Sequence, residues 1–302
     1  MNGKPCSPHK SVLEKSSCKT DTTEQLKEFF REGDFPWWQD AEQVKSDPLH
    51  RANHRLLVSA VRKIAPVSLL DVGCGCGLIT MDAAEFVTGT AVGMDISGKG
   101  LPVQGSRFSV QGSKLEAQSK DSKVFYVAGD AEDIPFKDDF FDCAVCSELL
   151  EHLPSLENGL REAHRVLRNG GWLLVTVPNL FCFDSIDGST HIIDRIFSVV
   201  NRIGKAIGVR EIQQDRTHVN RMTPQGWKKI IERNGFSVID TKPVYLVPYV
   251  PYFLKPLKKI EAYLFKHPVV ESAFYAAESR LGRLFPFSVM GQLHFFMCKK
   301  VK

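Results

Sequence analysis

The segment from Leu69 to Gly77 constrains the fold more than any other part of the sequence. It reads LLDVGCGCG, an apolar run that leads into three glycines at alternate positions. Glycine permits a tight turn and lets the backbone approach a ligand closely. The spacing is G-x-G-x-G rather than the G-x-G-x-x-G of dinucleotide-binding folds. The segment therefore predicts a buried strand, a ligand-binding turn and a helix that begins near residue 78.

Short apolar segments alternate with helical patterns over residues 67–178. Continuous apolar strands separated by helices are typical of a parallel sheet that is covered on both faces. The sequence therefore predicts an α/β fold with a doubly wound, mostly parallel, Rossmann-like sheet. The expected strands are 67–72, 91–96, 124–128, 141–146 and 172–177, and the expected helices are 78–87 and 156–167.

Composition divides the 302-residue chain into four parts. We expect a flexible polar tail at 1–22, a helical cap at 23–65, a ligand-binding domain at 66–242 with an insertion at 180–222, and an aromatic and basic extension at 243–302, which ends in a strand-like segment. The hydrophobic fraction of 43% is that of a globular protein and excludes a disordered chain. The net charge of +4 is too weak to indicate a nucleic-acid partner unless it is clustered.

Acidic residues also follow the second and third predicted strands. Asp95 ends the second strand, and Asp130 and Ala131 come directly after the third. The carboxyl ends of parallel strands line the ligand crevice of an open sheet. A carboxylate at Asp95 can accept hydrogen bonds from both hydroxyls of a ribose. The Asp130 side chain or a backbone amide beside it can meet the edge of an adenine.

This order of features resembles the class I S-adenosylmethionine-dependent methyltransferases. The segment VLRNGGWLL at 166–174 fits the same pattern. The resemblance implies that the glycine loop abuts the amino-acid part of S-adenosylmethionine and that the acid of the second strand binds its ribose. The expected cofactor-binding residues of this set are Asp71, Gly73, Gly75, Gly77, Asp95, Asp130 and Ala131.

A turn rich in acids follows the fourth predicted strand, with the sequence CSELLEHLP at 146–154. If 148–153 is a helical turn, then Glu148, Glu151 and His152 share one face. Two carboxylates and an imidazole can hold a divalent cation, and mainly oxygen ligands suit Mg²⁺ or Mn²⁺. Alternatively, the acids only complement the dipole of a helix N-terminus. In that case no metal is bound and His152 is the first candidate for a general base.

Four segments together resemble the ubiquinone biosynthesis O-methyltransferase family, whose members methylate catechol-like hydroxyls on polyprenylated rings. The resemblance implies that Arg55 and Ser147 also contact the cofactor. It further implies that Glu148, Glu151 and His152 bind Mg²⁺, with Glu148 and His152 as catalytic residues. The four segments are Trp37-Trp38, LHRANHRL at 49–56, the turn at 146–154, and Thr217-His218-Val219.

The chain departs from that family in ways that leave the acceptor open. His54 replaces the usual proline, and residues 129–136 look more like the quinone C-methyltransferases. The expected substrate is a lipid-like phenol or quinone. The alternatives are a quinone ring carbon, a small soluble acceptor, or a non-catalytic cofactor-binding scaffold in a biosynthetic enzyme assembly. His218 is either a hydrogen-bonded structural histidine or a base close to the substrate.

The insertion contains a segment at 191–210 with apolar residues at helical spacing and four basic residues. A basic amphipathic helix suits a membrane surface, although packing on the protein's own core is the commoner use of such a helix. The sequence therefore predicts a peripheral membrane protein. The expected location is the matrix side of the mitochondrial inner membrane in a eukaryote, and the cytoplasmic face of the membrane otherwise.

Overall fold

The structure is a computed structural model, and it describes residues 19–32, 41–98, 101, 106–107, 123–179, 218–246, 260 and 263–301. The predictions for Trp37 and Trp38, and for the helix at 191–210, lie outside the described residues. Within these ranges no helix is both long enough and apolar enough to cross a membrane.

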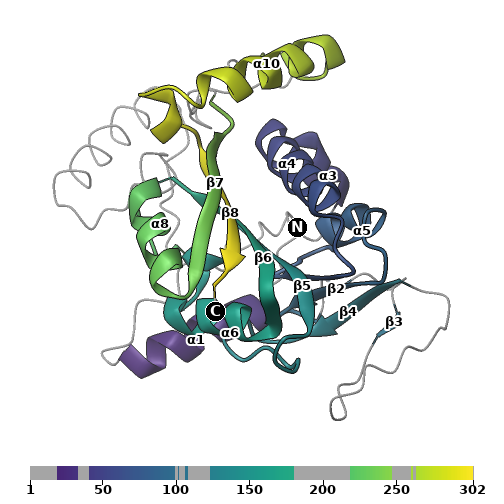
Figure 1. The fold of residues 1–302 in the computed structure, drawn as a ribbon, viewed down its shortest axis with the longest axis vertical. Helices are drawn as coiled ribbons and strands as arrows, with labels where there is room; N and C mark the ends of the chain where they lie inside the picture. The colour runs from purple at the N-terminus through teal and green to yellow at the C-terminus, as the bar shows by residue number, and fades with distance from the viewer. Residues whose placement is uncertain are drawn as a thin grey trace, which may run out of the picture.

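A single eight-stranded sheet forms the centre of the molecule (Figure 1). Its strand order is β3-β4-β2-β1-β5-β6-β8-β7, and β8 runs antiparallel to both of its neighbours while the other paired strands are parallel. This is the predicted doubly wound, mostly parallel α/β fold. The strands are β1 (Ser68–Val72), β2 (Thr90–Asp95), β3 (Ser106–Arg107), β4 (Val124–Ala128), β5 (Phe141–Ser147), β6 (Leu167–Pro178), β7 (Phe236–Val244) and β8 (Leu293–Lys300).

Helices cover the sheet on both faces because side chains alternate along each buried strand. Leu70 of β1 belongs to the apolar cluster that also contains residues of α6 and α8, whereas Leu69 belongs to the cluster formed with α4 and α5. The helices are α1 (Lys19–Glu32), α3 (Ala41–Ser46), α4 (Pro48–Ile64), α5 (Leu78–Ala84), α6 (Leu156–Val166), α8 (Pro224–Arg233) and α10 (Pro268–Leu281), with short 3₁₀ turns η2 (Leu150–His152) and η4 (Phe287–Val289).

Side-chain caps fix where several of these helices begin. Asp47 accepts hydrogen bonds from two backbone N–H groups at the start of α4, and Pro48 occupies its first turn. Ser155 and Thr223 cap α6 and α8 in the same way. Such caps satisfy N–H groups that have no partner within the helix. They fix the first residues of α4, α6 and α8.

The C-terminal strand belongs to the sheet rather than to a separate extension. β8 lies between β6 and β7 and pairs with both. The predicted boundary at residue 242 therefore falls inside β7, and the strand-like end of the chain completes the sheet. Between β7 and β8 the helix α10 runs across the end of the molecule beyond β7 and α4 (Figure 1).

Candidate functional site

The glycine loop turns sharply from β1 onto the end of β2. Gly73, Gly75 and Gly77 all have positive φ angles, of 73°, 52° and 73°. The N–H groups of Gly73 and Cys74 donate to the Met94 carbonyl at 2.7 and 3.0 Å. A Cβ atom on Gly73 would lie 2.9 Å from a methyl carbon of Leu149, in a backbone conformation that side chains rarely adopt. The loop therefore requires glycine for both its turn and its close packing.

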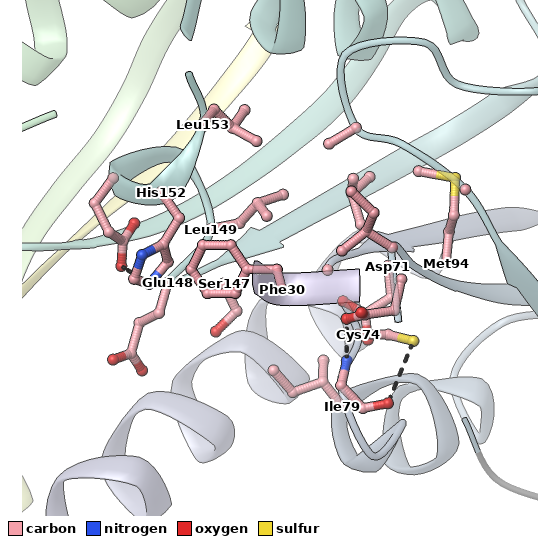
Figure 2. Close-up of a pocket in the computed structure, with 18 of the residues that line it drawn as sticks. Phe30, Asp71, Cys74, Ile79, Met94, Ser147, Glu148, Leu149, His152 and Leu153 are labelled. Carbon is pink, nitrogen blue, oxygen red and sulfur yellow. Dashed lines mark hydrogen bonds and ion pairs between the residues drawn. The ribbon is translucent and has the colours of Figure 1, made fainter. Parts of the chain in front are cut away.

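A cavity of about 290 Å³ lies at this edge of the sheet (Figure 2). The glycine loop, the end of β2, the residues after β4, the turn after β5 and α1 all contribute to its wall. Most of the predicted site residues come together there. They are Asp71, Gly73, Gly75, Asp95, Asp130, Ala131, Ser147, Glu148, Glu151 and His152.

Asp95 is oriented by the backbone on both sides of its carboxylate. Its Oδ2 accepts a hydrogen bond from Gly75 N–H at 2.9 Å, and its Oδ1 accepts one from Ser97 N–H at 2.8 Å. Burial raises the pKa of Asp95, and the two N–H donors oppose that rise. The carboxylate is thus held in a fixed orientation at the cavity wall.

The buried carboxylate of Asp71 has a hydrogen-bond partner among the described residues for only one of its two oxygens. Its Oδ2 accepts a 2.6 Å hydrogen bond from the Thr80 hydroxyl, while its Oδ1 has no hydrogen-bond partner among the described residues. Burial raises the pKa of Asp71 to about 7, and the Thr80 hydrogen bond partly opposes this. A buried acceptor without a partner is costly. The ammonium group of an amino-acid ligand in the glycine loop would satisfy it, so these residues fit S-adenosylmethionine.

Two predicted cofactor contacts are not brought into this cavity. Gly77 does not line it, and a Cβ atom there would lie 2.5 Å from the Tyr126 ring, so this glycine serves packing. Arg55 lies on the exposed face of α4, with its guanidinium 5.0 Å from the centre of the Tyr275 ring of α10. It lines a second cavity of about 260 Å³ next to the first.

The turn after β5 differs from the predicted helical turn. Glu148 has a φ of 49°, and the 3₁₀ turn η2 begins only at Leu150. The Glu148 carboxylate accepts a 2.9 Å hydrogen bond from Asn53 Nδ2 of α4, and Asn53 also donates to Ser147 Oγ. Figure 2 shows Glu148 directed away from His152. The predicted shared face of Glu148, Glu151 and His152 is therefore not formed.

A different group of three residues lies together at this turn. Ligating atoms of Glu151, His152 and His218 all lie within 4.8 Å of one another. Glu151 is buried, its Oε1 is 4.0 Å from His152 Nε2, and the two imidazole rings are 4.7 Å apart. The sequence had left the role of His218 open. The structure places it against His152 at the wall of the cavity.

Backbone hydrogen bonds hold His218 in this position. The N–H groups of Val219 and Asn220 both donate to the Glu151 carbonyl, and the Asn220 side chain donates to the carbonyls of Leu150 and Leu153. The segment that begins with His218 is thus docked along η2. The only signal for this in the sequence was its resemblance to a family motif, because spacing does not predict a contact so distant in the chain.

The N-terminal helix α1 lines the cavity; the sequence predicted a helical cap at 23–65 but not its contacts with the site residues. Leu26, Lys27 and Phe30 of α1 line it. Phe30 contacts His152 edge to face, with ring centres 5.1 Å apart. Lys27 forms ion pairs with Asp130 at 2.7 Å and with Glu132 at 2.8 Å. The predicted helical cap is therefore a wall of the site.

Comparisons with known proteins identify the family to which this part of the chain is similar. A family model described as a methyltransferase domain matches residues 70–175, which include the glycine loop, Asp95 and the turn after β5. The chain is 32% identical to ajmaline N-methyltransferase of Rauvolfia serpentina over 36% of this chain and 35% of that protein. It is 29% identical to the ubiquinone biosynthesis O-methyltransferase of Thiobacillus denitrificans over 47% of this chain and 58% of that protein.

A longer match is found with a third relative. The chain is 30% identical to the ubiquinone/menaquinone biosynthesis C-methyltransferase of Rhizobium rhizogenes over 65% of this chain and 76% of that protein. By their names, the three relatives transfer methyl groups to nitrogen, oxygen and carbon respectively, so the similarity does not specify an acceptor atom. With its sheet order, its glycine loop and this extent of similarity, the chain belongs to the class I S-adenosylmethionine-dependent methyltransferases.

Proposed function

We propose that the chain methylates a phenolic hydroxyl on an aromatic, lipid-like acceptor of the quinone-precursor type, with His152 as the general base. The observation that supports this most is the position of His152. It lies in the cavity wall beside the buried Glu151 carboxylate, next to the apolar side chains of Phe30, Leu149 and Leu153. An aromatic ring can pack against these apolar groups while its hydroxyl meets the imidazole.

The cofactor is held by groups that are already oriented in the structure. In this proposal Asp95 accepts hydrogen bonds from the ribose, and Asp71 Oδ1, which has no hydrogen-bond partner among the described residues, accepts one from the ammonium group. Ala131 follows β4 at the side of the cavity where an adenine would lie. When bound, S-adenosylmethionine supplies an electrophilic methyl group on a positively charged sulfur.

The acceptor needs help to lose its proton. A phenol titrates near pH 10, so it is mostly protonated at neutral pH. His152 accepts the hydroxyl proton as the acceptor oxygen becomes the nucleophile. Bound S-adenosylmethionine would supply the methyl group to that oxygen, and its sulfur would keep the electron pair of the broken sulfur–methyl bond. The nearby Glu151 carboxylate stabilises the imidazolium that results. The apolar side chains exclude water from the reacting groups.

Magnesium does not fit the residues that the structure brings together. Glu148, one of the two predicted carboxylate ligands, is bound to Asn53 instead. The remaining group has one carboxylate and two imidazoles, from Glu151, His152 and His218. Mg²⁺ prefers oxygen ligands and near-octahedral geometry, whereas imidazoles suit transition metals better. The proposal therefore uses no magnesium.

A ring carbon is the second candidate for the methylated atom. The relative with the longest match reported above is named as a C-methyltransferase, and it is matched over 76% of its length. Analysis of the product separates the two, because a methoxy group and a ring methyl group differ in their NMR spectra. A chain that binds the cofactor but methylates neither position would instead be a binding scaffold.

The test is turnover on a panel of short-chain prenylated catechols and quinols, with and without chelator. We expect methoxy products that form equally fast with chelator present. His152→Gln should lower kcat by about 10²–10⁴-fold, the usual contribution of a general base, and leave cofactor binding unchanged. Glu148→Gln is the matched control, because the amide oxygen can still accept from Asn53, and we expect a much smaller loss. Turnover that chelator abolishes and Mg²⁺ restores would contradict the proposal.

A further inference from the structure

The helix α10 and the residues that flank it expose an unusual amount of apolar surface. None of the residues of α10 is buried. Val269 is 80% exposed and Phe285 is 85% exposed, values far above those of ordinary apolar residues in a folded domain. We name this surface the α10 face. Its other exposed large apolar residues are Tyr263, Leu264, Val270, Leu281, Leu284, Phe287, Val289 and Met290.

The opposite side of α10 attaches it firmly to the body of the protein. Phe274 and Tyr275 pack against Tyr245 and Phe265 or against each other, and Glu271 pairs with Arg51 of α4 at 3.0 Å. These inner residues recur at the spacing of one helix face. The apolar side chains of the α10 face are therefore exposed to solvent and do not form part of the core.

The charges of residues 263–290 are divided between the same two sides. Both acids of this segment are engaged inward, because Glu271 pairs with Arg51 and Glu278 accepts a 2.6 Å hydrogen bond from the backbone N–H of Leu246. The exposed charged residues are Lys266, Arg280 and Arg283, all of them basic. The α10 face is thus apolar with basic groups beside it.

We propose that the α10 face docks on the surface of an anionic lipid bilayer. Apolar side chains beside cations suit the boundary between acyl chains and anionic headgroups. A second copy of the chain fits the surface less well, because the two copies would bring the same three cations together. This inference does not depend on which acceptor the enzyme methylates.

The helix α10 also forms part of the wall of the second cavity. The second cavity lies between α4 and α10, where it is lined by Arg51, Arg55 and Glu271. It shares His50 and His54 with the cofactor cavity. The proposed docking face and the second cavity therefore lie on opposite sides of α10, and a protein bound in this way would hold that cavity behind the helix that contacts the headgroups.

Flotation of the full-length chain with vesicles tests the apolar part of the proposal. The probes are vesicles of phosphatidylcholine alone, and vesicles that also contain about one third phosphatidylglycerol. We expect binding to the anionic vesicles and a partition coefficient at least about tenfold lower for the double variant Val269→Ser/Phe285→Ser. Val67→Ser is the matched control, because Val67 is 56% exposed and lies just before β1, and it should bind as the wild type does.

A charge variant tests the basic part. Arg280→Gln/Arg283→Gln should weaken binding to anionic vesicles and leave the small residual binding to neutral vesicles unchanged, and added salt should have the same effect on the wild type. Lys229→Gln on α8 is the control, since Lys229 is exposed elsewhere. Circular dichroism and S-adenosylmethionine binding show that each variant is folded.

Three outcomes would overturn the proposal. The wild type fails to float with anionic vesicles, or the folded double variant at Val269 and Phe285 floats as the wild type does. In the third outcome, analytical ultracentrifugation shows a dimer that the same double variant dissociates, which assigns the α10 face to a second copy of the chain. None of these results bears on the proposed chemistry, which is measured with soluble short-chain acceptors.

Discussion

Lys27 Nζ lies 2.7 Å from Asp130 Oδ2, so a residue of the N-terminal helix holds the acid that follows β4. Lys27 also reaches Glu132, and the two carboxylates raise its pKa against the effect of burial. Leu26 and Phe30 of the same helix line the cavity, so α1 forms part of the wall of the proposed cofactor site. The ion pairs therefore hold α1 at the cavity wall, against the residue expected beside the adenine.

Replacing Lys27 with methionine should weaken the attachment of α1. The side chains of Lys27 and Asp130 are 16% and 27% exposed, so we expect a loss of about 1 kcal/mol after allowing for solvent screening. The dissociation rate of S-adenosylmethionine should rise about fivefold in stopped-flow fluorescence. Arg31→Met is the control, because Arg31 pairs with Glu24 at the exposed surface. Equal dissociation rates for both variants would show that α1 does not retain the cofactor.

The ribose prediction concerns Asp95. Asp95→Ala should weaken S-adenosylmethionine binding by roughly 1.5–3 kcal/mol, the scale of hydrogen bonds to a charged group. Isothermal calorimetry on the folded variant measures this. Asp95→Asn separates the two roles of the side chain, because it can keep an acceptor for Gly75 N–H while losing the charge. An unchanged affinity for the alanine variant would remove Asp95 from the ribose site.

The parts of the structure that were predictable are those in which residues close in the sequence determine the outcome. The predicted strand at 124–128 has the observed bounds, and the other predicted strands of the parallel core differ from the observed ones by at most one residue at each end, except that β6 begins five residues earlier than predicted. The edge where Asp71, Asp95 and Asp130 meet follows from the rule that parallel strands end together. The hydrophobic periodicity of the strands and the spacing of the glycines are enough to predict these features.

The parts that were not predictable depend on contacts between distant segments. Nothing near Glu148 in the sequence indicates that Asn53, 95 positions earlier, will bind its carboxylate. Without that contact, a helical turn that joins Glu148 to Glu151 and His152 was a reasonable expectation. The left-handed backbone at Glu148 is uncommon for a residue other than glycine. The observed position of Arg55 could not be predicted for a similar reason, because the Tyr275 ring that it contacts belongs to a helix near the C-terminus.

Binding of the cofactor should depend on pH through Asp71. Burial raises the pKa of its carboxyl to about 7 in the free protein, whereas an ammonium group beside it would favour the ionised form. S-adenosylmethionine should therefore bind about tenfold more tightly one unit above this pKa than one unit below it. Asp71→Asn should bind weakly and lose this dependence. Calorimetry across this pH range gives both values, and an unchanged pH dependence in the variant would assign the titration to another group.

The same carboxyl should affect the stability of the free protein in the opposite direction. Its pKa is higher in the folded state than the ordinary value of 3.8, so the folded state binds the proton more tightly than the unfolded state. The contribution of Asp71 to the free energy of unfolding is therefore largest at low pH and decreases as pH rises from about 4 to about 7. Denaturant unfolding of the wild type and of Asp71→Asn over this range should show the decrease only in the wild type. A parallel pH dependence in the two proteins would contradict the raised pKa.

The segment at 191–210 lies outside the described residues, and its membrane-binding role stays a prediction from the sequence. Replacing Ile196, Val200 and Ile203 with serine should release part of the bound protein from anionic liposomes and leave the rest of the fold intact, as circular dichroism would show. If this segment and the α10 face contact the same bilayer independently, the free-energy losses of the triple variant and of Val269→Ser/Phe285→Ser should add when the changes are combined. A triple variant that unfolds would place these residues in the core. A triple variant that stays folded and floats as the wild type does would leave the α10 face as the membrane contact.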